Sequence, residues 1–180
     1  NQQIELPIAM FGDERANSKG MDLTDINEIT PLRNELNEWF AINQLDKASL
    51  ADNAVGVTNP ANLDQIVGQH VYHSADDMKD MLGLADETFK TWSNVAVSER
   101  AEILRKTADA LEENMSELIA LCIKEAGKVA QDSIDEVREA VDFCRYYAAK
   151  AEQLVTDERL SPRGVVLCIS PWNFPLAIFL

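Results

Sequence analysis

The side chain best placed to do chemistry is Asn173, in the hexapeptide SPWNFP at 170–175. It follows VVLCI (165–169), five apolar residues without alternation, which is typical of a strand buried on both faces of a parallel sheet. Pro171 cannot continue a hydrogen-bonded ladder, so we expect the chain to leave the sheet there and hold Asn173 at its rim. An amide held in this way can donate to an oxygen that becomes negative during acyl chemistry. Alternatively, Asn173 only caps a following helix.

The histidines and cysteines indicate no second reactive centre. His70 and His73 are the two histidines, and in a strand residues three apart point to opposite faces, so we predict no metal site. Cys122, Cys144 and Cys168 are widely spaced among apolar residues, which predicts buried free thiols rather than disulfides or a zinc site. No glycine-rich phosphate loop occurs, and the acidic pairs lie on predicted helices, where a solvated face is the usual explanation.

Composition excludes several classes of partner. The chain has 180 residues, 46% of them hydrophobic, enough for one domain with a core. Its 16 basic and 31 acidic residues leave a net charge of −15, which repels phosphate backbones and anionic lipid surfaces, so we expect neither nucleic acid nor membrane partners. No apolar run approaches the roughly 20 residues of a spanning helix. The start lacks the pattern of a signal peptide, and we predict a cytoplasmic protein that is a piece of a longer polypeptide.

The elements that must position Asn173 are mainly helical. Residues 1 to about 30 carry little periodicity and are predicted to be an arm that lies on another surface. A short helix is expected from Pro31, in PLRNELNEWFAI, and a strand or hairpin in NPANLDQIVGQHVYHS. A further helix from about Ser74 is predicted to bury Met78, Leu82, Phe89 and Trp92 on one face.

Three more helices follow in the prediction. Ser98 is expected to cap the first, and Asn114 to open the second with a capping box in NMSE. Gly127 is predicted to end that second helix in the left-handed conformation. The third, DSIDEVREAVDFCRYYAAKAEQL, has the strongest periodicity, with apolar positions from Ile134 onward in steps of three and four.

Several of these motifs resemble one known family. PRGVVLCISPWNFPLAI resembles the signature at the first cofactor-domain strand of the aldehyde dehydrogenase superfamily. SERAEILRKTADALE and EAGKVAQDSIDEVREAVDFCRYYA are similar to the preceding helices, in the same order and spacing, from about Asn59 to Leu180. The arm segment MFGDERANSKGMDL resembles the connection between the two catalytic modules of the proline utilization A family. Those are bifunctional flavoenzymes that oxidise proline to glutamate.

The resemblance implies an α/β parent with the aldehyde dehydrogenase fold and a Rossmann-like NAD domain. This chain is then mostly α-helical with a few strands and ends at the first buried strand of that domain. Residues 1–45 become an inter-module arm with a short helix, 46–161 the N-terminal strands and helices of the NAD-binding region, and 162–180 the first core strand with the oxyanion-asparagine loop. The parent is expected to be a homo-oligomer that binds NAD and oxidises a small aldehyde, L-glutamate γ-semialdehyde. FAD belongs to the proline dehydrogenase module, which is absent.

The family's functional residues transfer to six positions. The resemblance gives Asn173 the oxyanion role, makes Ser170, Pro171 and Trp172 the lining of the cofactor, and places Phe174 and Glu139 near the aldehyde. In the family the nucleophilic cysteine and the general base lie further along the chain, and none of the three cysteines here matches the nucleophile motif. We therefore expect no dehydrogenase activity and no FAD binding from this polypeptide alone.

Two rival interpretations stay open. The chain could derive from a monofunctional aldehyde dehydrogenase with an N-terminal extension and another substrate. It could also be an acidic helical interaction module without catalysis, in which SPWNFP is only a turn. Under any of these interpretations, an apolar strand VVLCI would present an edge for pairing, which predicts self-association of the isolated chain.

Overall fold

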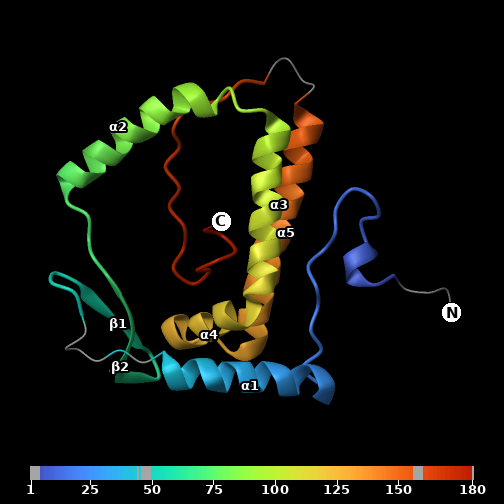
Figure 1. The fold of residues 1–180 in the computed structure, drawn as a ribbon, viewed down its shortest axis with the longest axis vertical. Helices are drawn as coiled ribbons and strands as arrows, with labels where there is room; N and C mark the ends of the chain where they lie inside the picture. Colours follow the sequence, from blue (N-terminus) through green and yellow to red (C-terminus); the bar gives the residue numbers. More distant parts are fainter. Residues whose placement is uncertain (1–4, 44, 46–49, 156–159, 180) are drawn as a thin grey trace.

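The computed structural model describes residues 5–43, 45, 50–155 and 160–179. Its elements are a short 3₁₀ helix η1 (Pro7–Ala9), α1 (Ile26–Ile42), β1 (Val55–Asn59), β2 (Asn62–His70), α2 (Ala75–Trp92), α3 (Val97–Glu113), α4 (Met115–Ala126) and α5 (Ala130–Leu154). Helices α3 and α5 lie side by side, α4 and α1 cross their lower end, and α2 stands away from them (Figure 1). The described chain is thus mostly helical with one two-stranded sheet, as predicted.

The core lies where α5 meets α3, α4 and α1. The predicted stripe of α5 is buried, and Ala108 of α3, Ile119 of α4 and Leu36 of α1 pack against it. The buried members of the stripe are Ile134, Val137, Val141, Cys144 and Ala148. Alanines at 101 and 108 let α3 approach α5 closely, since both are almost fully buried. Each large apolar side chain buried here stabilises the fold by about 1.5–3 kcal/mol.

Strands β1 and β2 form an antiparallel hairpin, which confirms the predicted strand or hairpin. Val55 is paired with His70 and Val57 with Gly68, and irregularities follow on either side of Thr58. At the turn, the Ala61 N–H donates to Oδ1 of the buried Asn59 at 2.9 Å. This Asx-type turn explains why the chain reverses there.

Two predicted helix ends are confirmed. Ser74 caps α2 in a capping box: its hydroxyl accepts from the Asp77 N–H at 3.1 Å, and the Asp77 carboxylate accepts from the Ser74 N–H at 2.8 Å. Gly127 follows α4 with φ of +67°, in the left-handed region, as expected of a glycine that ends a helix.

Two predicted helix starts and one predicted capping box are wrong. Helix α1 begins at Ile26 behind an Asp25 cap, so Pro31 lies inside it rather than at its start. Helix α3 begins at Val97 with Ala96 in the cap position, which leaves Ser98 inside the helix. Asn114 forms no capping box, because α4 follows α3 at once and its side-chain amide instead donates to the Ala110 carbonyl of α3 at 2.8 Å.

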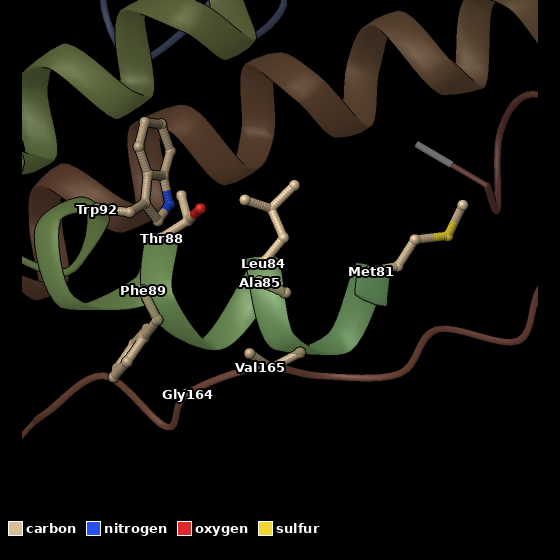
Figure 2. Close-up of a pocket in the computed structure, with 8 residues that line it drawn as sticks. All are labelled: Met81, Leu84, Ala85, Thr88, Phe89, Trp92, Gly164 and Val165. Atoms are coloured by element: carbon tan, nitrogen blue, oxygen red, sulfur yellow. The ribbon is translucent and has the colours of Figure 1, made fainter. Parts of the chain in front are cut away.

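The face of α2 predicted to be core is exposed, and no described residue of α2 is buried. The apolar pattern of α2 indicates a face that packs against a partner, and the described residues cover only part of that face. Gly164 and Val165 lie across it and form an apolar groove of about 520 Å³ (Figure 2). Met78 and Leu82 of the expected face are both about half exposed.

Residues 165–169 differ from the predicted buried strand. No strand pairs with them in the described chain, and their side chains are exposed, Ile169 by 86%. A parallel strand needs a hydrogen-bonded neighbour, and without one the segment is an unpaired extended run. Cys168 is exposed for the same reason, contrary to the expected buried thiol.

Candidate functional site

The loop that carries Asn173 folds back against the start of α5. Together they enclose a cavity of about 510 Å³. Four of the six predicted site residues line it: Glu139, Trp172, Asn173 and Phe174. Ser170 and Pro171 lie outside the lining and are exposed. The structure therefore brings the predicted oxyanion and substrate residues together, and separates two of the three predicted cofactor residues from them.

Glu136 holds the loop to the helix. Its Oε1 accepts hydrogen bonds from the backbone N–H groups of Leu176, at 3.0 Å, and Ala177, at 2.9 Å. Its Oε2 accepts from Lys128 Nζ at 2.7 Å. Burial acts to raise the pKa of the Glu136 carboxyl, but the Lys128 hydrogen bond and the two loop amides outweigh it, and the pKa lies below its ordinary value.

The corner between α4 and α5 forms the opposite wall. Gly127 is doubly constrained there, because its φ is positive and a Cβ would lie 2.9 Å from Cγ of Pro60 in the hairpin turn. Lys128 follows it, with Nζ 5.2 Å from the ring centroid of Phe174. The hairpin, the corner and the loop thus meet at one point beside the cavity.

The cavity is strongly acidic. Asp132, Asp135, Glu136 and Glu139 all line it, and Lys128 is the one basic residue in the described lining. Lys128 is paired with Glu136, and Arg138 lies 4.0 Å from Asp135. Asp132 and Glu139 are therefore the carboxylates that leave a negative field. Such a lining favours a ligand with an ammonium group and disfavours a bare anion.

The described residues fit one end of a dinucleotide only. Trp172 offers an indole that is 87% exposed beside the cavity, and an aromatic ring can lie against it. The acidic lining is unsuited to phosphates, and no unpaired basic side chain faces the cavity in the described part of the chain. The described lining therefore offers an aromatic surface at Trp172 and no group suited to a pyrophosphate.

The other candidate residues form no second site. Within the described ranges, no group of three His, Cys, Asp or Glu side chains is placed to hold a metal. His70 instead contacts Tyr72 edge to face, with ring centroids 4.6 Å apart. Burial raises the pKa of the Cys122 thiol to about 11 and also raises that of Cys144, which makes both poor nucleophiles. The groove beside α2 holds few polar groups besides the Thr88 hydroxyl and the Trp92 indole.

Sequence reasoning missed Glu136 and Lys128, having grouped Glu136 with the solvated acidic residues. A usable signal was present in α5. Glu136 lies three residues after Ser133 and four before Ala140, and both of these are fully buried. A charged residue inside a buried helical stripe needs a partner, and that partner is the loop.

Known proteins resemble this chain in sequence and in fold. The model of the aldehyde dehydrogenase family matches residues 47–180, and the chain belongs to that family. It is 37% identical over 182 residues to the bifunctional protein PutA of Escherichia coli (strain K12), covering 98% of this chain and 14% of PutA. It is also 37% identical over 132 residues to 1-pyrroline-5-carboxylate dehydrogenase 1 of Halalkalibacterium halodurans, covering 67% of this chain and 26% of that enzyme.

Solved structures agree with this assignment. Proline utilization A from Bdellovibrio bacteriovorus, inactivated by N-propargylglycine, superposes with a TM-score of 0.77 at 29% identity, over 90% of this chain and 19% of that one. The 1-pyrroline-5-carboxylate dehydrogenase from Thermus with bound NAD superposes with a TM-score of 0.74, and at 22% identity it supports the fold alone. The predicted resemblance is confirmed, and the chain spans only a small part of these relatives. Separately, none of the described helices is long and apolar enough to cross a bilayer.

Proposed function

We propose that this chain is the opening part of an NAD-dependent L-glutamate γ-semialdehyde dehydrogenase module within a bifunctional proline-catabolic enzyme of the cytoplasm. The observation that carries the proposal is the shared cavity of Asn173, Phe174 and Glu139. The residues that precede the family match support the bifunctional parent. The alignment with PutA covers 98% of the chain and therefore most of the arm, whereas the family model begins at residue 47.

Asn173 supplies the oxyanion donor in this proposal. When a cysteine thiolate from elsewhere in the parent attacks the aldehyde, the carbonyl oxygen becomes negative. The Asn173 amide donates to that oxygen, a role whose loss costs roughly 10²–10³-fold in turnover in comparable sites. When bound, NAD would supply the hydride acceptor, and Trp172 is the described residue that would lie against its nicotinamide ring.

The acidic lining supports an amino-acid aldehyde as substrate. L-Glutamate γ-semialdehyde carries an ammonium group and an α-carboxylate besides its aldehyde. Glu139 and Asp132 would attract the ammonium group, whereas the carboxylate needs donors from elsewhere in the parent. An aldehyde without an ammonium group would gain nothing from these carboxylates. The ammonium group therefore favours this substrate class over the monofunctional alternative with a simple aliphatic aldehyde.

The test uses an enzyme of full family length that carries this segment. NADH formation is followed with L-glutamate γ-semialdehyde and with propanal, for the wild type and for Asn173→Ala. We expect activity with the first substrate, weak activity with the second, and a fall in kcat of about 10²–10³-fold for Asn173→Ala with little change in the KM for NAD. Absence of NADH formation by the wild type would overturn the proposal. A silent Asn173→Ala would remove the oxyanion role and favour the turn interpretation.

The isolated chain gives a second test. We propose that it has no dehydrogenase activity, since none of its cysteines lies in the cavity lining that the structure describes. Purified chain incubated with the same aldehyde and NAD should produce no NADH above the rate without protein. NADH production would contradict this.

A further inference from the structure

Glu136 is the one charged residue that is fully buried in the described chain, with 3% of its surface exposed. A carboxylate is taken out of water at a high free-energy cost unless its oxygens find donors. Here both oxygens are satisfied, Oε1 by the N–H groups of Leu176 and Ala177 and Oε2 by Lys128. Two of these three donors, the N–H groups of Leu176 and Ala177, belong to the same loop (171–179) as Asn173.

The loop has few other anchors. Within 171–179 one backbone hydrogen bond is described, from the Phe174 N–H to the Pro171 carbonyl at 3.3 Å, and this bond only closes a turn. Asn173 is itself exposed, whereas Ala177 is buried against the helices. The position of Asn173 relative to α5 therefore depends on contacts made by its neighbours.

Lys128 completes the arrangement from the other side. Its Nζ bonds Glu136 Oε2 at 2.7 Å and lies 5.2 Å from the ring centroid of Phe174, the residue next to Asn173. The pair thus contacts the loop at Phe174 and again at Leu176 and Ala177. Pro175, between these points, has a fixed φ and no N–H, which limits how far the loop can move without breaking them.

We propose that Glu136, paired with Lys128, is a positioning residue that sets where the Asn173 amide lies in the oxyanion site. The inference rests on the proposed function, because it assigns Glu136 a role in the same reaction. It makes a specific prediction for Glu136→Gln. The amide oxygen of glutamine can still accept from the loop, but its NH₂ group would face the Lys128 ammonium, so the loop and the corner should separate.

The first experiment is a double-mutant cycle in the enzyme of full family length. Glu136→Gln, Asn173→Ala and the double variant are compared by steady-state kinetics with L-glutamate γ-semialdehyde. We expect Glu136→Gln to lower kcat by about 10–100-fold, as for a misplacement of order 1 Å, with little change in the KM for NAD. Because Glu136 acts through Asn173, the double variant should be no slower than Asn173→Ala. A multiplicative loss in the double variant, or an unchanged kcat in Glu136→Gln, would overturn the proposal.

Glu125→Gln is the matched control. Glu125 is an exposed glutamate on α4 that lines a small cavity with Pro175 and Leu176, and no hydrogen bond from it to the loop is described. The same chemical change there should leave kcat within about 2-fold of the wild type, because it removes no anchor of Asn173. A loss equal to that of Glu136→Gln would show that any glutamate near the loop matters, and would count against positioning.

The second experiment needs no catalysis and uses the 180-residue chain. Hydrogen exchange is measured at the Leu176 and Ala177 amides, with the α5 core as the internal reference. Both amides should be protected in the wild type and exchange faster in Glu136→Gln, while α5 stays protected. Wild-type exchange at these amides as fast as at the exposed Ile169 would refute the anchoring, whatever the kinetics show. An inactive wild-type enzyme with protected amides would instead remove only the proposed function.

Discussion

Ser18 of the arm and Asp142 of α5, 124 residues apart in the sequence, are joined by two hydrogen bonds. The Ser18 N–H donates to Asp142 Oδ1 at 2.6 Å and its hydroxyl to Oδ2 at 2.9 Å. Ser18 is fully buried, and Arg138 Nε donates to the same hydroxyl at 3.3 Å. The Lys19 N–H, next in the chain, donates to Glu112 of α3 at 2.8 Å. The arm is therefore hydrogen-bonded to α5 and α3, as expected of an arm that lies on another surface.

Replacing Asp142 should release the arm. Asp142→Ala leaves the buried N–H and hydroxyl of Ser18 without their acceptor, which should lower the free energy of unfolding by about 1–3 kcal/mol. Urea denaturation measures this, and limited proteolysis should show faster cleavage near Ser18. Asp109→Ala is the control, because Asp109 is exposed by 63% and its ion pair with Arg145 is worth about 0–1 kcal/mol. Equal stability and cleavage in Asp142→Ala and wild type would contradict the bonded arm.

Gly127 should not tolerate a side chain. Gly127→Ala forces a Cβ to 2.9 Å from Pro60 at a positive φ, and we expect a loss of about 1–3 kcal/mol of unfolding free energy. Gly83→Ala is the matched control, since Gly83 lies inside α2 and an alanine Cβ there would meet no atom within 4 Å, so the substitution should add about 0.5–1 kcal/mol. Thermal unfolding of the two variants should shift in opposite directions. A shift in the same direction would show that the corner can relax.

The depressed pKa of Glu136 predicts how stability depends on pH. A glutamate in the unfolded chain titrates near about 4.3, and the folded pKa is lower, so this group stabilises the fold fully above that pH. The contribution is lost as the pH falls through the folded pKa. Glu136→Gln should therefore show a flatter decline in unfolding free energy on acidification. Exposed carboxyls with lowered pKa, such as Asp77, are common to both proteins and cancel in the difference. An equally steep decline in the unfolding free energy of the wild type and of Glu136→Gln would contradict the prediction.

The three thiols should differ in reactivity. Burial raises the pKa of Cys122 to about 11 and also raises that of Cys144, whereas Cys168 is exposed on the extended segment. At neutral pH an alkylating reagent should modify Cys168 quickly and the other two only as fast as the core opens. Mass spectrometry of a time course distinguishes them, and Cys168→Ser should remove the fast phase. Fast labelling of Cys144 would show that α5 is not packed as described.

The sequence predicted those parts of the fold that local periodicity determines. The stripe of α5, the start of α2 near Ser74 and the left-handed Gly127 each follow from a pattern within a few residues, and all three are found. The predicted starts of α1 and α3 and the predicted capping box of α4 failed, because Pro31 was placed in a first turn, and Ser98 and Asn114 were given side-chain caps, from residue type alone. Neighbouring elements decided those ends instead: Asp25 precedes Pro31 by six residues, and α4 follows α3 without a loop.

The site was predicted in part. The motif SPWNFP indicated Asn173, Trp172 and Phe174, and the resemblance added Glu139, all of which line one cavity. The contacts of Glu136 with the loop lie 40 and 41 residues apart in the chain, so the pattern of α5 could indicate that Glu136 needs a partner but not that the loop is that partner. The burial expected of VVLCI and of α2 also failed. An apolar pattern indicates that a segment packs against a partner but does not identify that partner. The described residues do not bury either segment.

The bonded arm has a consequence for modularity. The family match begins at residue 47, yet Ser18 and Lys19 are held by residues of α5 and α3, well inside the matched region. The start of the family match is therefore not the edge of the hydrogen-bonded unit. A chimaera joined at residue 47, with an arm taken from a relative, would keep every matched residue. It would leave the Asp142 and Glu112 carboxylates without the hydrogen bonds that Ser18 and Lys19 donate to them. Exchanges between relatives should carry the arm and α5 together as one piece.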